Sequence, residues 1–230
     1  MSLADRLRSL RRESGLIESF GHMSWCAAIR SYLRIFHRLH VEGIENIPKE
    51  PPFVIVANHS SHLDALILAS RLSWRLRDDV YPIAAGDTFF ETPVAAAFAA
   101  IALNALPMWR KRGGGRHALE ELRARLINEK CVYVLFPEGT RSRDGAIGSF
   151  KAGIGMVIAG TSVPVVPCHL RGTHESLPPD RRWPRFRKIE LRIGAPQAFS
   201  QIANEREGWH TIASALESAV KQLDREKPPT

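Results

Sequence analysis

Two histidines and an aspartate lie in one short polar stretch, "ANHSSHLDA", at residues 57–65. His59 lies five residues before Asp64 and Ser61 lies three residues before it, a spacing that predicts a helix start with Asp64 in the first turn. A carboxylate placed there accepts a hydrogen bond from one imidazole nitrogen of His59 and leaves the other nitrogen as a proton acceptor. This is the general-base half of a catalytic triad without its serine, so the nucleophile would be a hydroxyl of the substrate.

Two other interpretations of this turn stay open from its residues alone. His59, His62 and Asp64 offer the nitrogen and oxygen donors of a metal site, although such a site needs further ligands and an outer shell. In the third interpretation, His59 only caps the helix and bonds to the backbone.

A second polar turn follows the apolar run of "VYVLFPEGTRSRDG" at residues 132–145. Its candidate binding residues are Glu138, Gly139, Thr140 and Arg141. Backbone amides around a glycine, a threonine hydroxyl and a planar guanidinium suit a phosphate monoester, because the guanidinium engages two oxygens at once. We therefore expect an anion pocket here, with a solvated turn as the alternative.

Both turns must be positioned by the strands that precede them. The apolar run "PFVIVA" before the first turn predicts a strand buried on both faces, and chemistry tends to lie at strand ends in sheets covered by helices on both sides. The rest of the chain alternates strand and helix, which predicts one α/β domain. Strands are expected near 40–44, 52–57, 80–84, 104–107, 132–136, 163–168 and 188–193, and helices near 62–73, 93–102, 114–128, 151–159 and 207–224.

Amino-acid composition and net charge limit the classes of binding partner that we expect. The chain has 230 residues, 44% of them hydrophobic, and a net charge of +8, which favours a polyanionic partner: nucleic acid, an anionic membrane surface or a phosphorylated substrate. Cys26, Cys131 and Cys168 are scattered among apolar neighbours and indicate small core residues in a reduced compartment rather than a disulfide framework. The first residues show no secretory signal, so a cytoplasmic location is expected.

Two segments are candidates for membrane contact. Residues 92–109 carry no charge, but Pro93, Asn104 and Pro107 interrupt them, so a buried core element is favoured over a spanning helix. The stretch from Leu16 to His40 is the stronger candidate.

In that stretch, apolar and basic residues recur at helical spacing. The apolar stripe is Trp25, Ile29, Leu33, Phe36 and Leu39, and the basic stripe is Arg30, Arg34 and Arg38. A basic amphipathic helix of this kind lies in a membrane interface, or it packs on the protein's own core; both alternatives stay open.

Four motifs together resemble those of the glycerolipid acyltransferases, in order and in rough spacing. They are "NHSSHLD" with His59 and Asp64, "PMWR" ending in Arg110, "FPEGTRS" at 136–142, and "VPVVPCHLRGT" at 163–173. The chain is similar to the branch that acylates lysophosphatidic acid, and the resemblance covers roughly residues 40–195. One position departs: the second motif of the family usually has an acid before its arginine, whereas Trp109 stands here. An acceptor other than lysophosphatidic acid therefore stays open.

The resemblance implies an α/β fold with a mixed, mostly parallel sheet flanked by helices, and we assign this acyltransferase domain to residues 40–230. The basic amphipathic pattern adds an expected helical membrane-association segment at 1–39. The resemblance also implies transfer of an acyl group from acyl-CoA or acyl carrier protein to a glycerol hydroxyl of a lysophospholipid, with no cofactor and no metal. His59 and Asp64 would be catalytic, and the expected substrate-binding residues are Arg110, Glu138, Gly139, Thr140 and Arg141. Backbone amides near the helix start would stabilise the oxyanion.

Two rival classes remain. A metal-dependent hydrolase would use His59, His62 and Asp64. A non-enzymatic basic module would use the arginines at positions 6, 8, 11 and 12 with the 30–38 stripe, but no nucleic-acid recognition motif accompanies that charge. Neither class explains "FPEGTRS", so we expect a peripheral enzyme on the cytoplasmic side of a membrane and no nucleic-acid partner.

Overall fold

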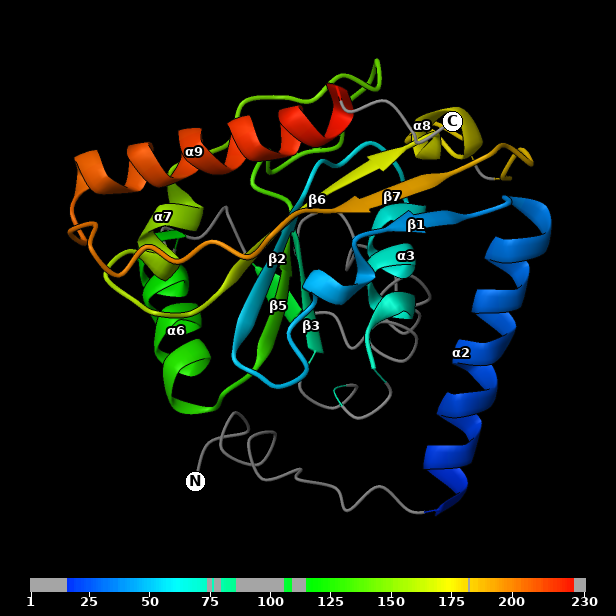
Figure 1. Cartoon of the computed structure of the whole chain (residues 1–230), viewed down its shortest axis with the longest axis horizontal. Helices are drawn as coiled ribbons and strands as arrows, with labels where there is room; N and C mark the ends of the chain where they lie inside the picture. Colours follow the sequence, from blue (N-terminus) through cyan, green and yellow to red (C-terminus); the bar gives the residue numbers. More distant parts are fainter. Residues whose placement is uncertain are drawn as a thin grey trace.

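The computed structural model describes residues 16–73, 76, 80–85, 106–108, 115–181 and 183–225. Among these residues, seven strands form one sheet in the order β1-β7-β6-β2-β5-β3-β4 (Figure 1). The strands are His40–Glu42 (β1), Phe53–Ala57 (β2), Val80–Ala85 (β3), Leu106–Met108 (β4), Val132–Leu135 (β5), Val165–Arg171 (β6) and Glu190–Ile193 (β7). Neighbouring strands are parallel except for the antiparallel pair β6 and β7. The expected mixed, mostly parallel sheet is confirmed.

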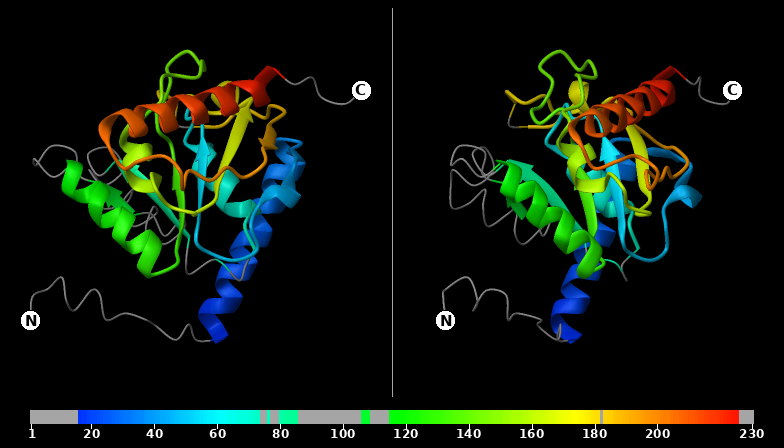
Figure 2. Two further views of the ribbon diagram at one scale, coloured as in Figure 1. Left: turned by 60° about the vertical axis from the view of Figure 1, so that its left-hand side comes forward. Right: turned by 90° about the vertical axis from the view of Figure 1, so that its left-hand side faces the viewer.

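Helices cover both faces of the sheet (Figures 1 and 2). They are α2 (Leu16–Phe36), α3 (Leu63–Arg71), α6 (Gly115–Asn128), α7 (Gly153–Ile158), α8 (Thr173–Ser176) and α9 (Arg206–Arg225), with a short 3-10 turn, η1, at Ile44–Asn46. Side chains of α2 and α3 share one buried cluster with the sheet, and side chains of α6, α7 and α9 share the cluster on the opposite face. The sheet is therefore the middle of three layers.

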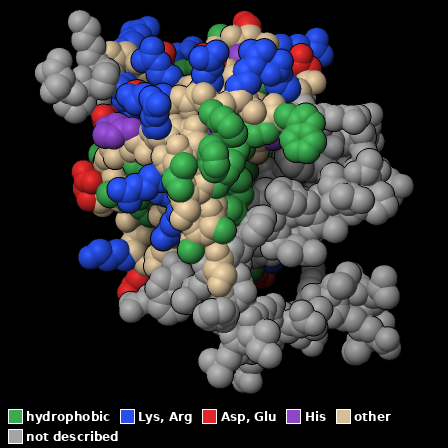
Figure 3. All heavy atoms as spheres, turned by 90° about the vertical axis from the view of Figure 1, so that its right-hand side faces the viewer, with side chains coloured by type: hydrophobic (Ala, Val, Ile, Leu, Met, Phe, Trp, Pro, Cys, Tyr) green, Lys and Arg blue, Asp and Glu red, His purple; other side chains and the backbone are tan. Residues whose placement is uncertain are grey.

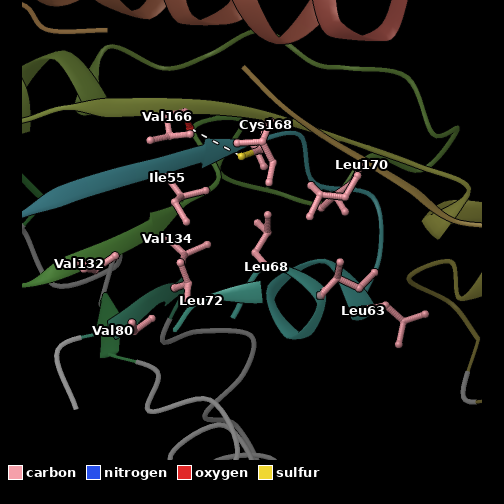
Figure 4. Packing of buried hydrophobic residues seen from close by; sticks show 14 of the residues in the cluster. Ile55, Leu63, Leu68, Leu72, Val80, Val132, Val134, Val166, Cys168 and Leu170 are labelled. Atoms are coloured by element: carbon pink, nitrogen blue, oxygen red, sulfur yellow. Dashed lines mark hydrogen bonds between the residues drawn. The ribbon is translucent and has the colours of Figure 1, made fainter. Parts of the chain in front are cut away.

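This layering explains the unbroken apolar sequence of β2. Phe53, Ile55 and Ala57 face the α2 and α3 side, whereas Val54 and Val56 face the α6, α7 and α9 side. Successive side chains of a strand point to opposite faces, so a strand covered on both faces needs apolar residues at every position. Figure 4 shows side chains of β6, β2, β5 and β3 packing towards α3.

The strand register brings the two polar turns together. β2 pairs in parallel with β5 on one side, from Phe53 opposite Val132, and with β6 on the other, from Val54 opposite Val165. Because the carboxyl ends of parallel strands meet at one edge of a sheet, the turn after Ala57 lies beside the turn after Leu135. The chain leaving β6 reaches the same edge.

The expected strands and helices occur, with shifted ends, wherever the structure describes them. α2 ends at Phe36 rather than near residue 40, because Arg38 adopts a φ of 44° as the chain turns into β1. The short elements η1 and α8 were not predicted. The expected helix at 93–102 lies outside the described residues.

The apolar stripe of α2 divides between core and surface. Ile29 and Leu33 are buried in the cluster that also contains β2 and α3, so these two residues follow the second alternative, packing on the protein's own core. Ile35 and Phe36 are exposed. In the part of the chain that the structure describes, the helices are too short or too polar to cross a membrane.

Candidate active site

His59 and Asp64 are in direct contact at the edge where β2 ends. The Nδ1 atom of His59 lies 2.9 Å from Oδ2 of Asp64. Asp64 lies in the first turn of α3, as expected, and is fully buried, whereas 14% of the His59 side chain is accessible. The pair therefore has a buried carboxylate and an imidazole that solvent or a substrate reaches.

The surroundings of Asp64 identify the tautomer of His59. The Oδ2 atom also accepts hydrogen bonds from the backbone amides of Ser60 and Ser61, each at 2.8 Å. Amides only donate, so Oδ2 acts as the acceptor in these contacts and takes its third hydrogen bond from Nδ1 of His59. Nδ1 of His59 therefore carries the proton, which leaves the lone pair on Nε2. Within the described residues, Nε2 has no hydrogen-bond partner.

Serine side chains fix the turn between these two residues. The Ser61 hydroxyl donates to the carbonyl of Leu177 at 2.7 Å and accepts from the amide of Leu63 at 3.1 Å. The hydroxyls of Ser60 and Thr173 lie 3.1 Å apart. The turn is thereby attached to the chain that follows β6. Sequence reasoning used Ser61 only as a capping signal and missed this attachment.

Asn58 is a positioning residue that sequence reasoning also missed. Its side-chain amide donates to the carbonyl of Leu170 at 2.9 Å and its side-chain oxygen accepts from the amide of Leu170 at 2.8 Å. These bonds continue the pairing of β2 with β6 past the end of β2. The signal was a polar side chain directly after a fully apolar strand, where a buried amide needs partners on both its ends.

Glu138 joins the two turns through backbone contacts. Its Oε1 accepts from the amide of His59 at 2.8 Å and its Oε2 accepts from the amide of Gly148 at 3.1 Å. Burial raises the pKa of Glu138, an effect that the two amide donors oppose. Ser142 adds a further tie by donating from its amide to the carbonyl of His59 at 2.8 Å. The carboxylate of Glu138 thus holds the backbone on which His59 stands.

A ring contact supports the imidazole from one side. His59 stacks on Phe136, with ring centroids 4.1 Å apart and an angle of 17° between the planes. Phe136 follows β5 and precedes Glu138, so the second turn supplies both a side-chain and a backbone support for His59. One face of the imidazole is therefore covered by protein, and its orientation is fixed by stacking as well as by Asp64.

Arg141 reaches across to the first turn and contacts His62. Its guanidinium lies 2.7 Å from Nδ1 of His62. The pKa of His62 is lowered, first by burial and then by the positive charge of Arg141. Burial also lowers the pKa of Arg141, while the carboxylate of Asp64 opposes that shift. A cation therefore lies beside the His59 pair, where it can meet an anionic group of a substrate.

The other expected binding residues differ in how they are placed. Gly139 adopts a φ of 75°, and a Cβ there would lie 2.7 Å from Nζ of Lys151. Thr140 is exposed in the same turn. Arg110 and Trp109 lie outside the described residues, so the second motif stays a prediction from the sequence.

The structure bears on two further expectations, the oxyanion donors and the metal-dependent alternative. The amides of Ser60, Ser61 and Leu63 bond to side chains of the same turn, so these amides are not the oxyanion donors that we expected near the helix start. Within the described ranges, no three His, Cys, Asp or Glu side chains are grouped as metal ligands. The metal-dependent alternative therefore gains no support from His59, His62 and Asp64.

The comparisons with known proteins agree with the motifs. A family model described as "Acyltransferase" matches residues 38–171, more than half of the chain. The chain is 34% identical over 146 residues to a chloroplastic 1-acyl-sn-glycerol-3-phosphate acyltransferase of Brassica napus, with 62% of this chain and 40% of that protein covered. It is 30% identical over 131 residues to 1-acyl-sn-glycerol-3-phosphate acyltransferase alpha of Homo sapiens, covering 56% and 44%. The chain spans less than half the length of these curated relatives.

A solved structure extends the likeness to almost the whole chain. The crystal structure of the 1-acyl-sn-glycerophosphate (LPA) acyltransferase PlsC from Thermotoga maritima superposes with a TM-score of 0.68 at 25% sequence identity. The superposition covers 98% of this chain and 88% of that one. The likeness in fold therefore extends well beyond the residues that the family model matches.

Proposed function

This chain belongs to the acyltransferase family, and we propose that it transfers a fatty acyl group from a thioester to the free glycerol hydroxyl of a lysophospholipid. The proposed acceptor is lysophosphatidic acid, the product phosphatidic acid, and the donor acyl-CoA or acyl-ACP. The named activity of the similar plant, human and bacterial proteins supports this choice of acceptor. A different lipid or glycolipid acceptor is the second candidate, because Trp109 replaces the usual acid of the second motif.

The observation that carries the proposal is the contact between His59 and Asp64. The carboxylate is buried and held by two backbone amides as well as by Nδ1 of His59. This arrangement leaves Nε2 of an accessible imidazole as the proton acceptor, which is what a general base requires. In this proposal His59 is the base, Asp64 orients it, and the substrate supplies the nucleophilic hydroxyl.

The proposed acyl transfer has two steps. Nε2 of His59 takes the proton of the acceptor hydroxyl as its oxygen attacks the thioester carbonyl, which forms the C–O bond and a tetrahedral intermediate. The intermediate collapses as the C–S bond breaks, and His59 returns the proton to the departing thiolate. Asp64 stabilises the imidazolium between these steps. A positioned general base typically contributes about 10²- to 10⁴-fold.

The proposed phosphate contacts are two arginines. Arg141 lies against His62, two residues before Asp64, and Arg110 is the proposed second cation from the sequence motif. The Thr140 hydroxyl is the proposed further phosphate donor. The Gly139 amide already donates to the carbonyl of Phe136 at 3.0 Å, so Gly139 is proposed to shape the turn rather than to donate to the phosphate. Glu138 acts as a positioning residue in this proposal, because both its oxygens bond to backbone amides.

The substrates set the proposed location. A lysophospholipid and a long acyl chain reside largely in membranes, so the protein would act as a peripheral protein on the cytoplasmic side of a membrane. The proposal includes no cofactor besides the acyl donor and no metal, because the steps above need only His59 and Asp64.

The test of this mechanism is acyl transfer by His59→Ala, with His40→Ala as the matched control. His40 is an exposed histidine on the edge strand β1, which β7 and β6 separate from β2. We expect His59→Ala to lose at least about 10²-fold in kcat with an unchanged circular dichroism spectrum, and His40→Ala to keep wild-type turnover. Near wild-type turnover by a folded His59→Ala protein would rule the mechanism out.

A panel of acceptors and donors identifies the substrates. Purified protein is assayed with lysophospholipids of different headgroups against acyl-CoA and acyl-ACP, each with and without EDTA. The highest kcat/KM is expected for lysophosphatidic acid, with no effect of the chelator. Preference for another headgroup would favour the second candidate, and loss of activity with EDTA would favour the metal-dependent alternative.

A further inference from the structure

One face of the molecule exposes large hydrophobic side chains from two distant segments. At the end of α2, Ile35 and Phe36 are 68% and 44% exposed, and before β7, Trp183 and Phe186 are 81% and 63% exposed. Figure 3 shows hydrophobic side chains gathered on this face, with lysine and arginine side chains beside them. We call Ile35, Phe36 and Phe186, which line one hollow, together with Trp183, three residues before Phe186, the apolar patch. Single exposed hydrophobic residues need no explanation, but a group of large ones marks an interaction site.

The two segments of the apolar patch are held together by specific contacts. The rings of Phe36 and Phe186 have centroids 4.8 Å apart. Beneath them, the carbonyl of His37 accepts from the amide of Ile189 at 3.0 Å, and Nδ1 of the buried His37 lies 3.3 Å from the carbonyl of Arg187. The patch is therefore preformed by the fold.

Cations border the patch. A hollow of about 370 Å³ is lined by Ile35, Phe36, Arg38, Phe186, Arg187 and Lys188. Lys188 bonds to Glu190 at 2.7 Å, whereas Arg38 and Arg187 form no ion pair with any residue that the structure describes. The hollow thus combines apolar walls with two uncompensated guanidinium groups.

We propose that the apolar patch, with Arg38 and Arg187, is the surface by which this protein docks on anionic phospholipid bilayers. Aromatic and aliphatic side chains enter the boundary between headgroups and acyl chains, while neighbouring cations attract anionic lipids. Charge complementarity selects this partner, because the cations at the hollow match lipid phosphates and the apolar side chains match the acyl boundary.

This inference places the contact at the end of α2 rather than along its length. Ile29 and Leu33 are buried in the core. Arg30 donates to the carbonyls of Ser70 and Leu72 at 2.7 and 2.9 Å, so it stabilises the end of α3. The docking surface takes its second half from residues 183–188, which the helical pattern of the sequence does not include.

The docking surface is connected to the candidate active site. The carbonyl of Leu177 accepts from the hydroxyl of Ser61 at 2.7 Å in the turn that carries His59. The amide of Arg185 donates to the carbonyl of Ser176 at 2.7 Å. One short segment therefore contacts the catalytic turn at its start and the proposed bilayer at Trp183 and Phe186. The inference rests on the proposed function, because the docking surface would hold a lipid acyltransferase in a fixed orientation at the membrane.

The test is co-sedimentation of the full chain with vesicles of phosphatidylcholine, with and without phosphatidylglycerol. Three double variants are compared: Phe36→Ser with Phe186→Ser, Arg38→Glu with Arg187→Glu, and a control, Lys49→Glu with Arg206→Glu. The control makes the same change in net charge at exposed residues outside the patch. We expect each patch variant to bind anionic vesicles about tenfold or more weakly, and the control and His59→Ala to bind like wild type.

The outcomes separate this inference from the catalytic proposal. Folded patch variants should retain turnover on detergent-solubilised substrate while losing turnover on bilayer substrate. Wild-type vesicle binding by both patch variants would overturn the inference. An equal loss of vesicle binding in the control variant would also overturn it, because binding would then depend only on the net charge of the protein. A change of oligomeric state in the patch variants without a change in vesicle binding would show that a second copy occupies the surface. Each of these results leaves the role of His59 to its own test.

Discussion

At the scale of single residues, Asp64 is the most constrained side chain of the candidate site. One of its oxygens accepts from Nδ1 of His59 and from the amides of Ser60 and Ser61, and the side chain has no contact with solvent. Its charge therefore organises the turn as well as the imidazole.

We expect Asp64→Asn to lower kcat by about two to four orders of magnitude, less than or equal to the loss in His59→Ala. The amide fills the same volume but carries no charge to stabilise the imidazolium, and it can present an NH₂ group to Nδ1, which favours the wrong tautomer. The measurement is single-turnover acyl transfer, with thermal unfolding as the check on folding. Wild-type turnover in a folded Asp64→Asn protein would show that the carboxylate only organises the turn.

Arg141→Ala should weaken the acceptor rather than the donor. Loss of a charge-assisted contact costs about 1.5–3 kcal/mol, or roughly 10- to 150-fold in KM. We expect that increase for lysophosphatidic acid, a much smaller one for monoacylglycerol, which lacks the phosphate, and little change for the acyl donor. Arg143→Ala is the matched control, since Arg143 is exposed two residues further on. An increase confined to the donor would place the phosphate site elsewhere.

The contact between His59 and Asp64 could be predicted because it is local. The two residues are five positions apart in the sequence, and a helix start fixes their relative positions. The contacts of Glu138 with His59 and of Asn58 with Leu170 join residues far apart in the chain, and no periodicity or spacing encodes such pairs. A single sequence therefore reveals the candidate reacting groups more readily than the residues that hold them.

At the scale of elements, α7 and α9 approach unusually closely at Gly155. A Cβ built on Gly155 would lie 2.4 Å from both the Cα and the carbonyl oxygen of Trp209. Backbone atoms cannot move aside as a flexible side chain can, so even one added carbon forces the two helices apart.

Gly155→Ala should therefore lower the free energy of unfolding by about 1–3 kcal/mol, the usual effect of overpacking a core. Gly115→Ala is the control, because nothing lies within 4 Å of its Cβ position, and alanine favours a helix over glycine by up to about 1 kcal/mol. Urea unfolding of both variants measures the difference. Equal stability of the two variants would contradict the close contact of α7 and α9.

The elements themselves were predicted best where hydrophobic periodicity is long or continuous. β2, α6 and α9 occur within a few residues of their expected limits, because covered strands and amphipathic helices carry a repeated signal. α8 has four residues and η1 has three, too few for any repeat. The division of the α2 stripe into buried and exposed residues depends on where α3 and the segment before β7 lie, which the sequence of α2 does not contain.

At the scale of the whole molecule, buried histidines couple stability to pH. Burial lowers the pKa of His37 and of His169 below the ordinary value of 6.5, and it does the same for His62. The unfolded chain therefore binds protons at a higher pH than the folded protein does, so falling pH favours unfolding from about 6.5 downwards until the folded pKa values are reached.

We expect the free energy of unfolding to decrease as pH is lowered from about 8 to about 5. His37→Asn should flatten this dependence, because the unfolded chain then gains one proton fewer, whatever the variant does to stability at neutral pH. His40→Asn serves as the control at an exposed histidine. Urea unfolding curves at several pH values give the slopes, and equal slopes for His37→Asn and wild type would show that His37 does not contribute.

The position of β2 between β5 and β6 also governs how the molecule reaches its native state. Val54 pairs with Tyr133 on one side and with Val165 on the other, so both its neighbours come from much later in the chain. Non-local pairing of this kind slows folding, because the entropy cost of closing a long loop comes before the stabilising contacts form. The His59 turn is complete only when both neighbours are in place, because Glu138 and Leu170 fix its backbone from either side. We therefore expect the candidate site to form late in folding, after β5 and β6 have paired with β2.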